Sequence, residues 1–181
     1  MAIPAGYTLR AHRAADMPLI VERHAALYSK DYNFNAELAA READKVAAAF
    51  LSSYDPKLDR CWVAEGPDGQ FSGCVFLVKD RDTDNAPSSS SGNEHSKDKI
   101  AKLRLLLVEP SARGSGLGRA LIGQCTQFAR EGGYSRIRLW TNSGLTTARR
   151  LYHREGYRIV KEEEDETFGI KLTAEFWELA L

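Results

Sequence analysis

The pattern of hydrophobic and polar positions is sharpest in the second half of the chain. Residues 99–108 are apolar on both faces, which is typical of a central strand covered on both sides of a sheet. Residues 117–131 carry apolar side chains at helical spacing and stop at two glycines, so they predict an amphipathic helix. The apolar positions of this helix are Leu117, Leu121, Cys125 and Phe128.

Weaker patterns of the same two kinds surround these elements. A helix begins after the capping residue Asp16 and runs through Leu27, and two further helices are predicted at 36–51 and 145–155. Short runs that favour strands lie at 7–10, 61–64, 71–78, 136–140, 157–160 and 176–181. This order of elements predicts an α/β domain with a mixed sheet, and residues 1–181 are expected to form that single domain.

One long polar segment interrupts the pattern at residues 80–99. It contains four consecutive serines, and it is too polar to pack and too long for a tight connection. We therefore expect a mobile surface insertion. His95 lies within it, and we expect that side chain to be exposed to solvent rather than catalytic.

Composition excludes several classes of protein. The 181 residues carry no net formal charge, which disfavours a nucleic-acid binder held by phosphate contacts. The longest apolar run is far too short to span a membrane, and residues 1–10 lack the apolar core of a signal peptide. The three cysteines have no metal-ligand spacing and predict buried, reduced thiols in a cytoplasmic protein. No metal site is predicted.

Charge is balanced overall but not locally. Residues 101–160 contain eleven Lys or Arg and only three acidic residues, which gives this block a net charge of +8. A neutral protein with one basic segment favours a compact anion as ligand, although solvated helix faces are the better explanation for most of these arginines.

A glycine-rich turn lies between the central strand and the amphipathic helix. Gly114, Gly116 and Gly118 occupy alternate positions there, and Arg113 and Arg119 stand beside them. The free N–H groups and the dipole of a helix that starts near Gly116 favour a phosphate ligand. A plain strand–helix turn is the alternative, and three alternating glycines beside two arginines disfavour it.

Two common phosphate motifs do not fit this turn. A P-loop needs Gly-Lys-Ser or Gly-Lys-Thr at its end, and Gly118-Arg119-Ala120 has neither the lysine nor the hydroxyl group. A dinucleotide-binding turn needs a third glycine where this chain has Arg119.

The sequence resembles the GNAT family of N-acetyltransferases. The segment 113–118, Arg-Gly-Ser-Gly-Leu-Gly, is similar to that family's Arg/Gln-x-x-Gly-x-Gly/Ala signature. The segment 148–157 is similar to its second marker, Ala-x-x-Leu-Tyr-x-x-x-Gly-Phe/Tyr, and the two occur in the usual order and separation. Segments such as Arg23-His24 and Leu27-Tyr28 also resemble the acetyltransferase half of bacterial proteins that carry a MarR-type DNA-binding domain, and we expect no such half here.

The resemblance implies a fold, a co-substrate and a set of residues. It implies a mostly antiparallel sheet with splayed central strands, flanked by helices, and acetyl-CoA as co-substrate without a metal. Loop N–H groups would bind the pyrophosphate, and the pantetheine arm would pair with the strand before the loop. The Leu106 N–H would face the thioester carbonyl as an oxyanion donor. The implied cofactor-binding residues are Leu106, Leu107, Val108, Arg113, Gly114, Ser115, Gly116, Leu117, Gly118, Arg119, Asn142 and Tyr152.

Tyr152 occupies the family's usual position for the acid that protonates the departing thiolate. A phenol, with a pKa near ~10, can protonate a thiolate whose thiol has a pKa near ~8.5. Helix periodicity alone would instead make Tyr152 a packed aromatic residue, and the motif favours the acid. With Leu106 it forms the predicted catalytic pair.

The chain departs from the family pattern at two places. Leu145 stands where many relatives carry an asparagine that bonds the pantetheine, and Asn142 is the candidate to replace it. Lys102 stands near the glutamate base of some relatives, so that base is missing. The amine still needs a route for its proton, and Glu22, Glu42, Tyr28 or a chain of water molecules remain candidates for it.

The acceptor is expected to be a small primary amine or an amino acid. Tyr28 and Tyr32 are the candidate substrate-binding residues, although such aromatic residues can equally anchor a loop to the core. A protein lysine or N-terminus is the alternative substrate, and a non-catalytic acyl-CoA-binding module is the alternative class. We expect no nucleic-acid or membrane partner, and a homodimer is compatible with the sequence.

Overall fold

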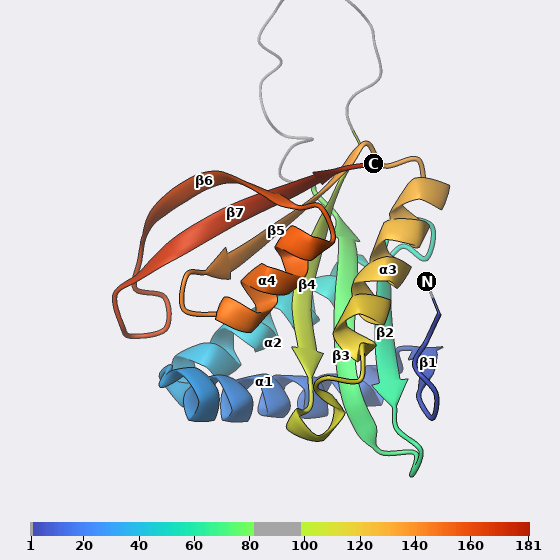
Figure 1. Ribbon diagram of the computed structural model, residues 1–181, viewed down its shortest axis with the longest axis horizontal. Helices are drawn as coiled ribbons and strands as arrows, with labels where there is room; N and C mark the ends of the chain where they lie inside the picture. The colour runs from blue at the N-terminus through green and yellow to red at the C-terminus, as the bar shows by residue number, and fades with distance from the viewer. Residues whose placement is uncertain (1, 82–98) are drawn as a thin grey trace, which may run out of the picture.

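The fold is a single α/β domain built on one mixed sheet, as a computed structural model shows for residues 2–81 and 99–181 (Figure 1). The sheet has seven strands in the order β1-β2-β3-β4-β5-β7-β6. All pairings are antiparallel except that between β4 and β5. The strands are β1 (Thr8–Ala11), β2 (Arg60–Glu65), β3 (Phe71–Lys79), β4 (Ile100–Val108), β5 (Arg136–Asn142), β6 (Arg158–Asp165) and β7 (Leu172–Ala180).

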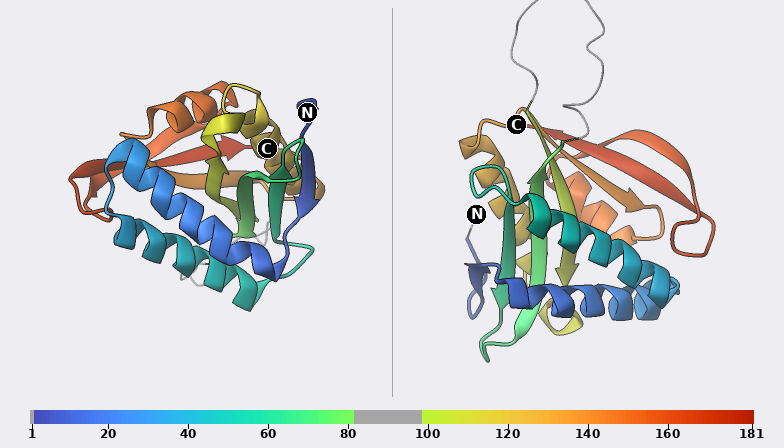
Figure 2. Two further views of the ribbon diagram at one scale, coloured as in Figure 1. Left: turned by 90° about the horizontal axis from the view of Figure 1, so that it is seen from below. Right: turned by 180° about the vertical axis from the view of Figure 1, so that it is seen from behind.

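Helices cover both faces of this sheet (Figure 2). One face carries α1 (Met17–Tyr32) and α2 (Ala36–Ser53), and the other carries α3 (Leu117–Glu131) and α4 (Thr146–Arg154). Two short 3₁₀ helices, η1 (Ala14–Asp16) and η3 (Pro110–Ala112), precede α1 and follow β4.

Each face of the sheet has its own core. Leu121, Ile122 and Cys125 of α3 are fully buried, and they pack against inward-facing residues of β3, β4 and β5. Ile20 of α1 and Phe50 of α2 pack with residues of β2 and β3 on the opposite face. Burial of β4 on both faces explains why its sequence is an almost unbroken apolar run.

The two halves of the sheet separate beyond Leu103. The strands β4 and β5 pair only through Ile100–Leu103 and Arg136–Leu139, and the rest of β5 pairs with β7 alone. The register between β4 and β5 therefore ends at Leu103, and residues 105–108 of β4 have no paired residue in β5. This confirms the predicted sheet with splayed central strands.

A β-bulge in β4 marks the point of separation. The register with β3 shifts by one residue between Arg104 and Leu107, and Leu105 takes a left-handed backbone conformation with φ +47°. Gly73 of β3 makes this close approach feasible, because a Cβ atom there would lie 2.5 Å from the Leu107 carbonyl oxygen. Bulges re-aim neighbouring groups, and this one lies at the candidate site.

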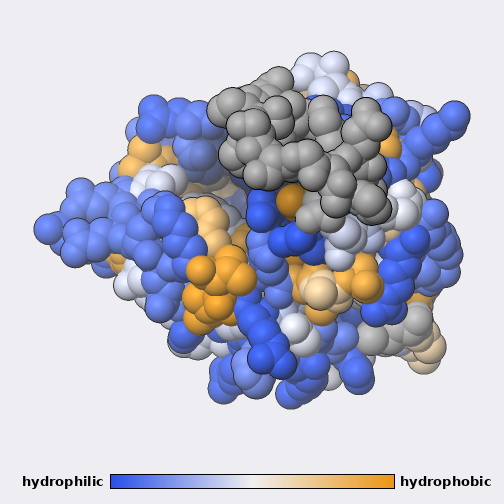
Figure 3. Space-filling model, turned by 90° about the horizontal axis from the view of Figure 1, so that it is seen from above, coloured by the Kyte–Doolittle hydropathy of each residue, from blue (hydrophilic) through white to orange (hydrophobic). Residues whose placement is uncertain are grey.

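The predicted elements agree with the observed ones, with differences in detail. Asp16 precedes α1 as predicted, but its side chain does not cap that helix. It accepts from the Arg13 N–H and pairs with Arg10, at 2.8 Å. β7 begins at Leu172, four residues before the predicted start, because this part pairs with the exposed edge strand β6. Seen from above, the end of the molecule formed by β6 and β7 is largely hydrophilic (Figure 3).

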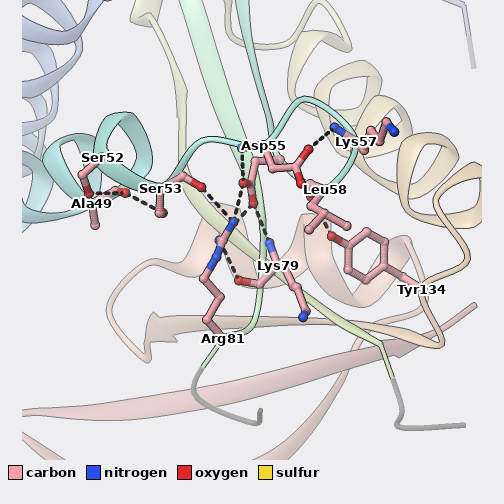
Figure 4. Close-up of polar contacts among 10 residues, drawn as sticks. Ala49, Ser52, Ser53, Asp55, Lys57, Leu58, Lys79, Arg81 and Tyr134 are labelled. Carbon is pink, nitrogen blue, oxygen red and sulfur yellow. Dashed lines mark hydrogen bonds and ion pairs between the residues drawn. The ribbon is translucent and has the colours of Figure 1, made fainter. Parts of the chain in front are cut away.

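The predicted insertion lies mostly outside the described residues, and so does His95. Its first two residues are described. Arg81 bonds the buried Asp59 carboxylate at 2.7 Å and the Ser53 carbonyl oxygen at 2.9 Å (Figure 4). The same carboxylate accepts from the N–H groups of Asp55 and Lys79, so all of its contacts are structural. Among the described residues no helix is long and apolar enough to cross a membrane.

Candidate active site

The glycine-rich turn forms an open cradle of backbone N–H groups at the end of β4. Gly114 and Gly116 have φ values of +79° and +92°, which side-chain-bearing residues rarely adopt. A Cβ atom at Gly114 would meet nothing within 4 Å, so the loop is open beside this residue. Within the described part of the chain, the N–H groups of Gly114, Ser115, Gly116, Gly118 and Arg119 have no hydrogen-bond partner. Such a cluster at a helix N-terminus fits a phosphate.

The two arginines beside the cradle already have carboxylate partners. Arg113 pairs with Asp31 at the end of α1, at 2.6 Å, and Arg119 pairs with Glu155 after α4, at 2.8 Å. Both guanidinium groups are about half exposed, so these pairs are weak. The arginines tie the loop to its neighbours and leave N–H groups as its unpaired donors.

An outer pocket lies along the unpaired edge of β4 and encloses about 130 Å³. Its walls come from the end of α1, from β4 and from α4, so it runs from the cradle toward the separation of the sheet. The lining residues are Leu27, Tyr28, Tyr32, Leu106, Leu107, Val108, Arg113, Leu145, Thr147, Ala148 and Leu151.

A deep pocket of about 90 Å³ lies where the two halves of the sheet separate. It shares Tyr28, Leu106, Leu145 and Ala148 with the outer pocket, so the two meet around the β4 bulge. Its other lining residues are His24, Ala39, Glu42, Ala43, Val46, Leu103, Arg104, Leu105, Trp140, Thr141, Asn142, Tyr152 and Phe168.

Tyr152 stands at the deep pocket with a free phenol group. Its side chain is only 5% exposed and lies near the rings of Tyr157 and Trp177, at 5.7 and 6.2 Å between centroids. No described residue bonds its hydroxyl group. Burial, reinforced by the nearby Tyr28 phenol, raises the pKa of Tyr152 well above its usual value. The group is therefore protonated at neutral pH, as an acid must be before it acts.

The aromatic residues predicted to bind substrate form a cluster at the end of α1. Tyr28 contacts the rings of Tyr32, Phe34 and Phe168 edge-on, at 5.8 to 6.3 Å between centroids. Tyr28 lines both pockets, whereas Tyr32 lines only the outer one. The cluster thus anchors the loop after α1, and Tyr28 and Tyr32 also line the pockets, while their contact with substrate stays a prediction.

The candidates for the proton route lie in different surroundings. Glu42 lines the deep pocket and bonds Lys45 at 2.5 Å. Glu22 is exposed and does not line the pocket. Lys102, at the position of the missing glutamate, pairs with the buried Asp80 at 2.9 Å. Of the two glutamates, therefore, only Glu42 is placed to meet a ligand there.

Two buried polar groups line the deep pocket, and sequence reasoning missed the first, His24, and assigned the second, Asn142, to the cofactor. His24 and Asn142 are each 1% exposed, and His24 Nε2 and Asn142 Oδ1 have no hydrogen-bond partner in the described structure. Asn142 had been predicted to contact the cofactor, and it lines the deep pocket but not the outer one. Periodicity placed His24 on the inner face of a helix, which is ordinarily a packing position.

An ion pair holds His24 in place. The neighbouring Arg23 binds the Glu109 carboxylate at the end of β4 through two hydrogen bonds, of 2.6 and 2.8 Å. Glu109 in turn donates its backbone N–H to the Ser72 carbonyl oxygen of β3. The middle of α1 is thereby fixed across the bulged end of β4.

Other reactive groups are not arranged for chemistry. All three cysteines are buried and unpaired, as predicted, and burial raises the pKa of Cys61, Cys74 and Cys125 above the ordinary thiol value. Buried thiols of this kind are poor nucleophiles. No group of three or more metal-ligating side chains occurs among the described residues.

Comparisons with known proteins agree with this geometry. The sequence profile of the GNAT acetyltransferase family matches residues 22–157. A GNAT N-acetyltransferase of Kribbella flavida superposes with a TM-score of 0.69, at 22% identity, over 97% of this chain and 98% of its own. The yncA protein of Salmonella typhimurium, solved with acetyl-CoA, gives 0.66 at 21% identity, over 97% and 94% of the two chains.

A further structural match comes from Vibrio cholerae. Its spermidine N-acetyltransferase, solved with CoA and spermine, gives a TM-score of 0.66 at 16% identity, over 97% of this chain and 96% of its own. At these identities the solved structures establish the fold alone. A search of curated protein sequences finds no match to this chain.

Proposed function

This chain belongs to the GNAT family of acetyltransferases, and on that premise we propose that it acetylates the nitrogen of a small primary amine or amino acid. As a member of this family it is an acetyl-CoA-dependent acyltransferase. The proposal adds the acceptor, the direct attack of the amine within a ternary complex, and the residues that act. The likeness to the acetyltransferase half of MarR-type fusions, the cytoplasmic location and a homodimer stay predictions from the sequence.

The observation that carries the proposal is that two pockets meet at the bulge of β4. The outer pocket leads from the N–H cradle along an unpaired strand edge, which suits an extended arm with amide groups. The deep pocket reaches the same place from the side of α1 and α2. A thioester and an amine that enter through separate pockets can therefore meet without a covalent enzyme intermediate.

The residues present fit acetyl-CoA. The loop from Arg113 to Gly118, with Leu117 and Arg119 opening α3, offers unpaired N–H donors to a pyrophosphate. The strand residues Leu106, Leu107 and Val108 line the outer pocket, where β4 can pair with the pantetheine arm. When it is bound, acetyl-CoA supplies an activated thioester carbonyl.

Two groups of the chain carry the chemistry in this proposal. The Leu106 N–H, next to the bulge, stabilises the negative charge that develops on the carbonyl oxygen. Tyr152 lines the deep pocket with an unpaired hydroxyl group and donates its proton to the departing thiolate. Its buried position keeps that proton in place until the thiolate forms.

The deep pocket supports a small acceptor. About 90 Å³, enclosed mostly by apolar and aromatic side chains, suits a compact amine better than a long polyamine or a folded protein surface. Tyr28 lies at the meeting point and Tyr32 at the outer entrance, so we propose that Tyr28 contacts the acceptor and Tyr32 borders it.

The test measures release of CoA thiol from acetyl-CoA in the presence of single acceptors. n-Butylamine, benzylamine, alanine and a lysine-containing peptide form the panel, and mass spectrometry identifies the acetylated product. Turnover of one of the three small amines supports the proposal, and preference for the peptide would move the function to protein acetylation.

A binding measurement separates the remaining alternatives. Tight binding of acetyl-CoA by calorimetry, with no turnover of any acceptor, would indicate a non-catalytic acyl-CoA-binding module. Thermal stabilisation by NAD or ATP, and none by CoA, would contradict the proposed function altogether.

A further inference from the structure

The deep pocket contains two buried hydrogen-bond acceptors that no group of the described chain satisfies. They are Nε2 of His24, from the middle of α1, and Oδ1 of Asn142, from the end of β5. A buried polar atom without a partner costs free energy, and such atoms are uncommon in folded proteins. Both side chains line the deep pocket, so a bound ligand can supply the missing partner.

The surroundings fix which atom each side chain presents. Nδ1 of His24 lies 2.8 Å from the Ile20 carbonyl oxygen, which can only accept, so we assign the proton of the neutral ring to Nδ1, and this leaves a lone pair on Nε2. The Asn142 amide nitrogen lies 3.3 Å from the Asp165 carboxylate, and this orients Oδ1 away from Asp165. Both free atoms are therefore acceptors and require N–H or O–H donors.

We propose that the acceptor substrate is a neutral primary amine whose two N–H bonds are donated to His24 Nε2 and Asn142 Oδ1, and that His24 takes the proton that this nitrogen loses. The inference rests on the proposed function, and it names the recognition and the proton route of that same site. A primary amine has two N–H bonds and one lone pair. Two acceptors hold the bonds and leave the lone pair free for attack.

The proton lost by the amine and the proton gained by the sulfur are both accounted for by groups of the site. As the nitrogen lone pair forms a bond to the acyl carbon, the nitrogen becomes positively charged and far more acidic than the free amine. His24 Nε2 accepts one of its protons and becomes an imidazolium, while the carbon–sulfur bond breaks and the sulfur takes the proton of Tyr152. Transfer of a proton from His24 back to Tyr152, through solvent, restores both groups.

Burial lowers the pKa of His24 to about 4, so the free enzyme presents a neutral ring. The carbonyl oxygens of Ile20 and Leu105 and the negative Glu109 act in the opposite direction, so they offset part of the cost of the transient imidazolium. Arg23 is neutralised by Glu109, and Tyr28 faces the ring at 5.6 Å between centroids. The other ionisable groups that line the pocket are Glu42, Arg104 and Tyr152.

The first test compares the kinetics of two variants and a control. His24→Asn keeps an N–H for the Ile20 carbonyl oxygen and removes Nε2, and Asn142→Leu removes Oδ1. We expect kcat to fall by about 10²–10³-fold in His24→Asn and kcat/KM for the amine by about 10–100-fold in Asn142→Leu. The KM for acetyl-CoA should stay within about twofold in both variants.

His12→Asn is the matched control. His12 also has an unpartnered buried ring nitrogen, and burial lowers its pKa too, but it packs on Phe50 and Tyr54 and lines neither pocket. Its kcat should equal that of the wild type. In His24→Asn hydroxide must take the proton, so kcat should keep rising with pH up to pH 10, whereas wild-type kcat levels off.

A second test needs no turnover. In protein with ¹⁵N-labelled histidine, His24 should show a protonated Nδ1 and a bare Nε2 at pH 7. Addition of n-butylamine in the presence of CoA should shift the Nε2 resonance and leave that of His12 unchanged. A His24 Nε2 that carries a proton, or that ignores the amine, would overturn the proposal even if every variant were poorly folded.

The outcomes separate this inference from the function on which it rests. If the wild type acetylates a primary amine and His24→Asn does so at the same rate and with the same pH profile, only the role of His24 is wrong. If an N-methyl secondary amine reacts as fast as its primary parent, the two-acceptor recognition is wrong. If no amine reacts at all, the proposed function fails as well.

Discussion

The N-terminal cradle of α3 and the deep pocket are built in opposite ways. The cradle comes from one continuous segment, residues 113–119, and its donors are backbone N–H groups. The deep pocket draws on α1, α2, β4, β5, α4 and the loop before β7, and what it presents are side chains. In the proposed function the cradle binds the pyrophosphate, which every acyl-CoA carries. The side chains of the deep pocket can differ between enzymes that act on different acceptors.

The cradle and the deep pocket should therefore affect different properties of the enzyme, namely affinity for acetyl-CoA and turnover. Substitutions in the cradle should change affinity for acetyl-CoA and leave the chemistry intact, because we place only the pyrophosphate, far from the reacting carbonyl, at its backbone donors. Substitutions in the deep pocket should change turnover and leave that affinity intact.

Tyr152→Phe should produce the largest change. Loss of the acid should lower kcat by about 10²–10³-fold, with the Kd for acetyl-CoA nearly unchanged, measured by steady-state kinetics and calorimetry. Because burial raises the pKa of Tyr152, the wild type should show no alkaline loss of kcat up to pH 10.

Tyr157→Phe is the matched control for that variant. Tyr157 is 1% exposed, its hydroxyl group also has no hydrogen-bond partner among the described residues, and it lines neither pocket. Its removal should leave kcat unchanged. Equal rates for Tyr152→Phe and the wild type at every pH would show that another group protonates the thiolate.

The neutral His24 should make stability depend on pH. Burial lowers its pKa in the folded state to about 4, against about 6.5 when the chain is unfolded. Its contribution is therefore complete above pH 6.5 and is lost as pH falls through 4, because the unfolded chain binds the proton first. The shift corresponds to about 3 kcal/mol of unfolding free energy.

Denaturant unfolding of the wild type and of His24→Asn at pH 7 and pH 4 measures this effect. Other acidic groups titrate equally in both proteins, so the difference between the two free energies of unfolding isolates His24. A difference that does not change with pH would mean that His24 titrates normally. The cradle, made of backbone groups, should contribute no such dependence.

Gly116→Asp tests the cradle. The φ of +92° strains any side-chain-bearing residue, and the carboxylate would stand where we place the pyrophosphate. The Kd for acetyl-CoA should rise by about 10–100-fold in calorimetry, with kcat at saturation little changed. Gly133→Asp is the control, since Gly133 has a φ of +70° at the other end of α3. Equal affinities in the two variants would remove the cradle from the site.

The sequence locates the cradle directly, but it does not reveal how the deep pocket is assembled. The turn from Arg113 to Gly118 was predicted as an anion site because its strand, glycines and helix follow one another directly. The helices and strands were also predicted closely, since each follows from its own periodicity. The unpartnered state of His24 and Asn142 was not predicted, because it depends on how α2, β4, α4 and the loop before β7 pack around them.

Arg113 and Arg119 show what a continuous stretch of sequence cannot predict, namely contacts with distant residues. Their proximity to the loop was correctly predicted, but their partners, Asp31 and Glu155, come from distant parts of the chain. The β4 bulge was not predicted either, because it also depends on a distant part of the chain. An apolar strand was expected, whereas the left-handed Leu105 and the close approach of Gly73 depend on pairing with β3.

Asp31→Asn should give the smallest effect, and with the opposite sign. Asp31 holds Arg113 at 2.6 Å beside the cradle, so its removal leaves one unneutralised positive charge near the pyrophosphate. The Kd for acetyl-CoA should fall by about two- to fivefold in low salt, and the gain should vanish in 0.5 M NaCl, as expected of an exposed ion pair. Glu131→Gln, which removes one negative charge at the far end of α3, should change nothing. Weaker binding in Asp31→Asn would show instead that Asp31 orients Arg113 toward the phosphates. In that case a distant side chain would help to build the cradle, and the contrast between a backbone-built cofactor site and a side-chain-built acceptor site would be less complete.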